Sequence, residues 1–169
     1  MRRFRSKGIE NYAPTCQCEK CRGMCKRIPC KGTPTEMQRI IDAGLGYQLQ
    51  LDWWAFSDFD LSLGKSRESK RVYILAPGIK ANPGANYPRD IFKLCECQLF
   101  IGGKCQVHGM KPLLGRIARC GQGAVDNADF DDFISAVSLI VVRLWDRPEG
   151  KRVIRDWRKR FVDTRARVW

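Results

Sequence analysis

Nine cysteines, gathered in two short stretches of a 169-residue chain, constrain this protein more than any other feature. They stand at Cys16, Cys18, Cys21, Cys25 and Cys30, and then at Cys95, Cys97, Cys105 and Cys120. In a secreted domain such a density indicates a disulfide framework, although an odd number leaves one thiol over. In a reducing compartment the same thiolates are the soft ligands that bind zinc and iron–sulfur clusters.

The rest of the chain favours the reducing compartment, because no targeting signal is visible. The N-terminal residues 1–5 are basic but lack the apolar stretch of a secretory signal. No window offers the roughly eighteen uncharged apolar residues that a membrane span requires. We therefore expect a cytoplasmic protein without a membrane span, whose cysteines bind metal rather than form disulfides.

The spacing of the cysteines suggests one centre shared by both stretches. Cys18-x2-Cys21 is a tight pair that lets two sulfurs face one ion, and 64 residues without cysteine separate Cys30 from Cys95. We expect metal to hold an N-terminal loop against a distant hairpin, so that metal binding supplies part of the folding free energy. The predicted ligands are Cys16, Cys18, Cys21, Cys25, Cys30, Cys97, Cys105 and Cys120, with Cys95 and His108 as further candidates.

Local patterns predict an α+β fold: a small, irregular, metal-stabilised domain with a capped N-terminal helix, a short hairpin and a C-terminal helical pair. Thr33-Pro34-Thr35-Glu36 is a capping box that opens a helix, and Gly44 or Gly46 ends it. Residues 71–76 read as a strand that Pro77-Gly78 stops, and 47–56 as a strand or an extended segment. Residues 57–70 and 79–91 read as loops, and Gly102-Gly103 joins 98–101 to 104–108 in a hairpin.

The division of the chain follows from these patterns. Residues 1–15 form a basic arm, 16–123 the cysteine domain, and 124–169 a helical pair with a basic tail. The helices are expected near 127–145 and 151–162, since apolar residues recur there at spacings of three and four.

The net charge of +13 lies mostly at the two ends of the chain. Residues 1–32 carry nine Lys or Arg against two acids, and residues 145–169 carry nine against four. Such ends favour contact with a polyanionic partner, which is nucleic acid, an acidic protein or a membrane face, although solvated tails are an equal alternative. The predicted contact residues are Arg152, Arg155, Arg158, Lys159 and Arg160. Trp53-Trp54 fits core or rim packing better than a base-stacking platform, which is the alternative.

Several of these landmarks together resemble the YkgJ-type cysteine-cluster family, whose members are described as zinc- or iron-chelating. The similar stretches are the run at 16–30 with the capped helix behind it, Asp52-Trp53-Trp54, Leu75-Ala76-Pro77-Gly78, and the run from Cys97 to Arg116. One position departs from the family pattern, because Gly115 stands directly before Arg116 where the family has a cysteine. The resemblance implies metal chelation by zinc or a [4Fe–4S] cluster and supplies no reaction.

The sequence thus favours a metal-binding protein whose centre is structural or redox-sensing, with basic ends that contact an acidic partner. An iron–sulfur enzyme or electron carrier, and a nucleic-acid-binding protein with a structural metal, are the alternatives. His108 is the only histidine, and no Gly-x-Ser-x-Gly or P-loop pattern occurs, so we assign no catalytic residues and expect no hydrolytic activity.

Overall fold

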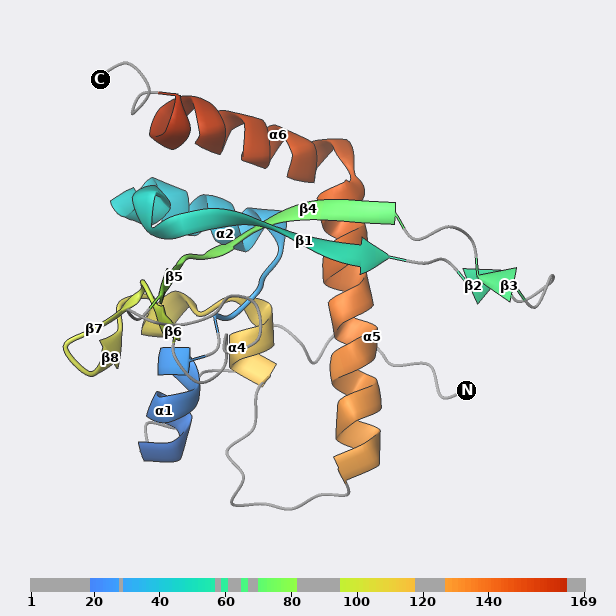
Figure 1. Cartoon of the computed structure of the whole chain (residues 1–169), viewed down its shortest axis with the longest axis horizontal. Coiled ribbons are helices and arrows are strands. Elements are labelled where there is room, and N and C mark those ends of the chain that lie inside the picture. Colours follow the sequence, from blue (N-terminus) through green and yellow to red (C-terminus); the bar gives the residue numbers. More distant parts are fainter. Residues whose placement is uncertain are drawn as a thin grey trace.

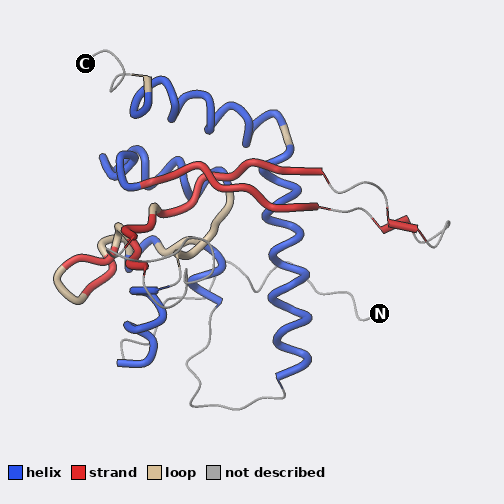
Figure 2. Tube along the Cα trace, in the orientation of Figure 1, coloured by secondary structure: helices blue, strands red, loops and turns tan. Residues whose placement is uncertain are grey.

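The protein has an α+β fold that combines helices with short antiparallel strand pairs (Figure 1). The computed structural model describes residues 19–27, 29–56, 59–60, 65–66, 70–81, 95–117 and 127–163. The predicted arm over residues 1–15 lies outside these ranges. Figure 2 shows the two long strands running between helices, with the smaller strand pairs beyond their two ends.

Two helices come first, and only the second was expected. The helix α1 (Glu19–Arg27) replaces the predicted loop, because Glu19 lies in its first turn and Lys26 and Arg27 in its last, where each charge suits the helix dipole. The helix α2 (Pro34–Ile40) confirms the capping box: the Thr33 side chain accepts from the backbone N of Glu36, and the Glu36 side chain accepts from the backbone N of Thr33.

After α2 the chain continues through the π-helical turn η2 (Ile41–Leu45) and the 3-10 turn η3 (Gly46–Gln48). Gly44 interrupts the helical backbone with a φ of 80°, a conformation that favours glycine, so the predicted helix stop is confirmed.

The central sheet is an antiparallel pair of eight-residue strands, β1 (Leu49–Phe56) and β4 (Lys70–Pro77). Leu51 lies opposite Leu75, and Trp53 lies opposite Tyr73, so these four side chains share one face. Val72, Ile74 and Ala76 are buried on the other face. Both predicted strands are therefore confirmed, and the extended-segment alternative for 47–56 is resolved in favour of a strand.

Three smaller strand pairs complete the sheet structure: β2 (Phe59–Asp60) with β3 (Lys65–Ser66), β5 (Ile79–Ala81) with β6 (Cys95–Cys97), and β7 (Phe100–Ile101) with β8 (Lys104–Cys105). The loop predictions for 57–70 and 79–91 are wrong where these strands occur, because the sequence alone does not show which distant segment pairs with a short strand. The remainder of both predicted loops lies outside the described residues.

The predicted hairpin turn is confirmed at Gly102-Gly103, whose φ angles of 59° and 76° suit a two-residue hairpin turn. The hairpin is shorter than expected. His108 belongs to the 3-10 turn η4 (His108–Met110) instead, and the short helix α4 (Leu113–Ile117) follows it.

The C-terminal pair consists of α5 (Asn127–Asp146), which packs against β4 and β1, and α6 (Pro148–Trp157), which the turn η5 (Arg158–Val162) extends. Helix α5 ends one residue later than predicted, and α6 ends at Trp157, from where η5 continues to the predicted end at Val162. The second begins three residues early, because Pro148 at its first turn supports a helix start rather than a break. None of the described helices combines the length and apolar composition of a membrane crossing.

One apolar core joins these parts, and two of its tryptophans donate hydrogen bonds to backbone carbonyl groups. Trp145 is 1% exposed, and its indole Nε1 donates to the carbonyl oxygen of Gly32 over 2.8 Å. Trp157 donates in the same way to the carbonyl of Gly46 over 2.7 Å. Buried indole N–H groups need such acceptors, so α5 and α6 each hold a fixed position against the α2 region.

Asp146, at the end of α5, is expected to contribute to acid sensitivity. Hydrogen bonds from Lys70 at 2.8 Å and from Lys151 hold its pKa below the ordinary value. A lowered pKa in the folded state means that this stabilisation is present above the unfolded pKa of about 3.9 and is lost as the pH falls through the folded value. Asp146→Asn should cost less than about 1 kcal/mol at pH 7 and flatten the loss of stability below pH 4. Urea unfolding of both proteins at pH 7 and pH 3 measures this, and equal acid slopes would contradict it.

Candidate metal centre

Four thiols from the two cysteine stretches lie in one part of the fold. Cys25 belongs to the last turn of α1, Cys30 precedes α2, and Cys97 and Cys105 end β6 and β8. Helix α1 contacts both β6 and β8, and these elements gather with α4 at one end of the molecule (Figure 1). All four residues are present as thiols, and Cys97 is buried.

Burial, with a contribution from neighbouring thiols, raises the pKa of three of these four cysteines. Burial and then the charge of Cys25 raise the pKa of Cys30 to about 12, with smaller contributions from Cys105 and Cys97. Burial, together with the charges of Cys105 and Cys25, raises the pKa of Cys97 to about 11. Burial and Cys25 also raise the pKa of Cys105. The cysteines at positions 25 and 30 therefore interact electrostatically with those at positions 97 and 105.

A buried lysine belongs to the same group of side chains. Lys111 is 6% exposed and stands at the start of α4. Burial lowers the pKa of Lys111, but its hydrogen bond to Cys25 and the charges of Cys25, Cys30 and Cys105 outweigh burial and raise the pKa overall. The cluster thus combines four cysteines with one buried cation, and burial favours the neutral thiol form of Cys30, Cys97 and Cys105.

Gly115 lets α4 come close to this cluster. A Cβ at position 115 would overlap Sγ of Cys30, and it would lie 3.6 Å from Cδ of Lys111. Only a glycine leaves room for the sulfur at this place. The position at which the sequence departs from the cysteine-cluster pattern therefore lies against one of the thiols.

Glu36 fixes the position of α4 relative to α2. Its Oε2 accepts from the backbone N of Thr33 at 2.9 Å and of Leu113 at 3.1 Å, and its Oε1 accepts from Arg116. Glu36 is 8% exposed, so these bonds satisfy a buried charge. Because Lys111 and Gly115 flank these contacts in the chain, Glu36 helps to place the residues that meet Cys30.

The structure does not describe the side chains of the five other cysteines. Cys16, Cys18 and Cys120 lie outside the described residues, as do the side chains of Cys21 and Cys95. Nε2 of His108 is buried and meets no hydrogen-bond partner within residues 95–117 or the other described ranges. Over the same ranges, no three His, Cys, Asp or Glu side chains are close enough together to form a completed metal site.

The sequence did not reveal Lys111 or Glu36 as members of this region. Glu36 was identified only as a capping residue, and its bonds to Leu113 and Arg116 join residues 77 and 80 positions apart. A lysine between a methionine and a proline carries no pattern that distinguishes a buried cation from a surface one. The Lys-Pro step before α4 was visible, but its burial was not.

The cations predicted to contact a partner lie on the outer side of the C-terminal helix. Arg152, Arg155, Arg158, Lys159 and Arg160 are all exposed. Val153 and Trp157 are buried on the opposite side, and Ile154 and Phe161 pack against the core. The amphipathic character that the sequence predicts for this segment is confirmed.

The contact between Gly115 and Cys30 leads to a specific expectation. Gly115→Ala should displace Cys30 and destabilise the fold by about 1–3 kcal/mol, because the added methyl group has no free space. Gly109→Ala is the matched control, since a Cβ at position 109 meets nothing within 4 Å. Thermal unfolding and thiol titration of the two variants measure the difference, and equal stabilities would contradict the close contact.

Comparisons with family models, with curated proteins and with solved structures found no match to this chain.

Proposed function

We propose that the protein binds a metal centre through cysteines drawn from both stretches, with Cys25, Cys30, Cys97 and Cys105 as its core ligands. The observation that supports this most is that α1, which carries Cys25, contacts β6 and β8, the strands that end in Cys97 and Cys105. Four thiolates are the common ligand number of both structural zinc and iron–sulfur centres.

Because the thiols are buried, a bound metal would contribute to the stability of the fold. Cys30 and Cys97 have raised pKa values, mainly because burial disfavours the thiolate. A divalent ion or a cluster replaces the protons and compensates the negative charge, so binding releases protons and couples to folding. The four thiols would have to close further onto the ion, since the described residues do not form a completed site.

Lys111 suits such a centre as a compensating charge. Four thiolates around one divalent ion carry a net charge of −2, and a buried ammonium beside Cys25 reduces the charge of the assembly. Hydrogen bonds to ligand sulfurs also tune the reduction potential of iron–sulfur centres. The centre is proposed to be structural or redox-sensing, and the exposed cations of α6 and η5 are proposed to contact an acidic partner.

Metal analysis of protein purified in parallel with and without oxygen tests this proposal. The expected result is about one zinc per chain in a colourless protein, or iron with inorganic sulfide and visible absorption that oxygen bleaches. Stoichiometric zinc would exclude the redox cluster. A folded protein that contains no metal under either condition, and takes up none on reconstitution, would overturn the proposal.

A further inference from the structure

An exposed aromatic surface, separate from the thiols, lies on the β1–β4 sheet. Trp53 and Tyr73 are 47% and 49% exposed, and they stand directly opposite each other on neighbouring strands. Tyr47, just before β1, is 51% exposed. We call Trp53, Tyr73 and Arg71 the aromatic surface. Large aromatic side chains exposed as a group commonly mark an interaction site.

The pairing of the strands explains why this surface is bare. Leu75, on the same face of β4 as Tyr73, is fully buried, and Leu49 on β1 is 6% exposed. The core therefore covers this face at the Leu49–Pro77 end of the sheet and leaves it uncovered at Trp53 and Tyr73. Trp54 points to the other face, where it is partly buried and packs against the core. The Nζ atom of Lys31 lies over its ring, 4.3 Å from the centroid. Packing against the core thus explains the position of Trp54, but it does not explain why Trp53 is exposed.

Positive charge accompanies the exposed rings. The guanidinium of Arg71 lies over the Trp53 ring at 4.7 Å from its centroid, and in the described part of the chain it has no carboxylate partner. The nearby carboxylates are engaged elsewhere: Asp52 pairs with Lys31 at 3.0 Å, and Asp146 pairs with Lys70 at 2.8 Å. The surface therefore presents aromatic rings and a cation without a compensating acid.

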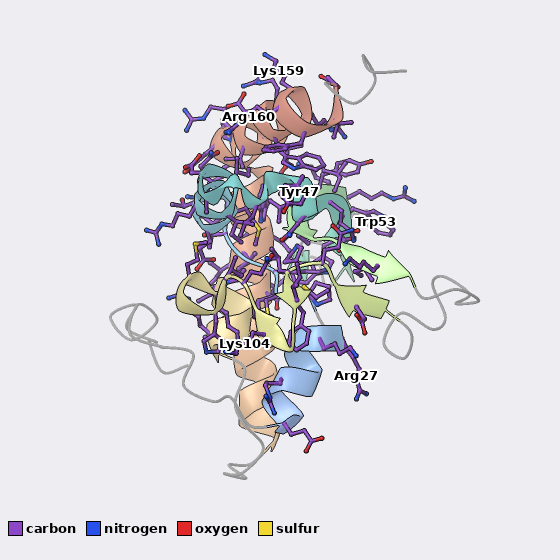
Figure 3. All side chains as sticks on the ribbon, turned by 90° about the vertical axis from the view of Figure 1, so that its left-hand side faces the viewer. Arg27, Tyr47, Trp53, Lys104, Lys159 and Arg160 are labelled. Carbon is purple, nitrogen blue, oxygen red and sulfur yellow. The ribbon has the colours of Figure 1, made fainter. Side chains whose placement is uncertain are left out.

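The basic turn η5 lies near Tyr47, before the start of β1. Phe161 of η5 contacts Gly46, and Trp157 donates to the same residue, so the cations beside Phe161 lie next to the start of β1. In Figure 3, Tyr47 and Trp53 lie in the middle of the view, below Arg160 and Lys159 and above Lys104 and Arg27. Rings flanked by cations match a chain that offers both bases and phosphates.

We infer that the aromatic surface binds single-stranded nucleic acid, with bases stacking on Trp53 and Tyr73 and phosphates contacting Arg71 and the η5 cations. Stacking explains the exposed rings, and the net charge of +13 supplies the attraction for phosphates. An unpaired strand is favoured over a duplex because the rings need accessible base faces. This inference does not depend on the metal centre.

Fluorescence anisotropy with labelled dT15 and U15 tests the inference on the full chain. Binding should weaken steeply with salt, and Trp53→Ala should lower the affinity roughly 5- to 150-fold, the usual effect of removing one stacking partner. Tyr73→Ala should act in the same direction, and Trp53→Phe should keep most of the affinity. Ile140→Ala on α5 is the matched control, since Ile140 is an equally exposed side chain outside this surface, at 51%.

Three results would overturn the inference. One is an absence of binding at low salt; another is an affinity that Trp53→Ala and Ile140→Ala change equally. The third is duplex DNA that binds as tightly as the single strands and loses nothing in Trp53→Ala, because phosphate contact alone would then explain it. Circular dichroism of each variant separates a lost site from a lost fold.

Discussion

Cys97→Ala should weaken metal binding by at least about 100-fold, because loss of a ligand costs more than loss of a group that only supports a ligand. With metal in excess, a 100-fold loss of affinity lowers the free energy of unfolding by about 2.7 kcal/mol. The sulfur itself contributes about 1 kcal/mol through packing, since Cys97 is 6% exposed. Chemical unfolding with and without a chelator separates the two contributions.

The chelator supplies the internal control for this prediction. Once metal is removed, wild type and Cys97→Ala should differ only by the packing contribution of about 1 kcal/mol. Val107→Ala, on the same hairpin region and 2% exposed, should lose packing energy but keep the metal affinity. If the chelator leaves the wild-type stability unchanged, the thiols stabilise the fold by packing alone.

Glu36→Ala should destabilise the protein by about 3–5 kcal/mol, the typical result of breaking a buried charged pair. The variant removes one acceptor that serves the backbone of Thr33 and Leu113 and the Arg116 side chain. Two backbone N–H groups lose this acceptor, and a largely buried guanidinium loses its carboxylate. Because α4 carries Gly115 beside Cys30, metal affinity should fall together with stability.

Two further variants show whether the charge or the shape of Glu36 matters. Glu36→Gln keeps an acceptor oxygen and should cost about 1–3 kcal/mol. Glu149→Ala is the surface control: its carboxylate accepts only from the Thr35 hydroxyl at 3.5 Å among the described residues, so its loss should cost below about 1 kcal/mol. Equal effects of Glu36→Ala and Glu149→Ala in urea unfolding would contradict the role of Glu36.

The elements that the sequence predicted are those with local signals. The box at Thr33 and Glu36, the Gly102-Gly103 turn and the apolar periodicity of α5 each depend on neighbouring residues. The sequence did not predict α1, because its cysteines were interpreted as part of a metal-binding loop. The charges at the two ends of this segment nevertheless suit a helix. The strands β5 and β6 were missed because their pairing joins residues far apart in the chain.

The candidate site was predictable as a set of residue types and not as an arrangement. Cys25, Cys30, Cys97 and Cys105 were predicted ligands, and the fold brings them within electrostatic range of one another. The burial of Lys111 and the contact of Gly115 with Cys30 follow from the approach of α4, which the Glu36 carboxylate holds across the fold. Such long-range contacts produce no periodic pattern in a sequence.

X-ray absorption at the metal edge, on freshly purified protein, tests the shared centre most directly. One metal centre per chain should show a shell of about four sulfurs, at about 2.3 Å if the metal is zinc. Cys30→Ser and Cys97→Ser, one from each cysteine stretch, should each reduce that shell. A shell that loses sulfur in one variant and is unchanged in the other, or one built of oxygen and nitrogen, would contradict a centre that both stretches share.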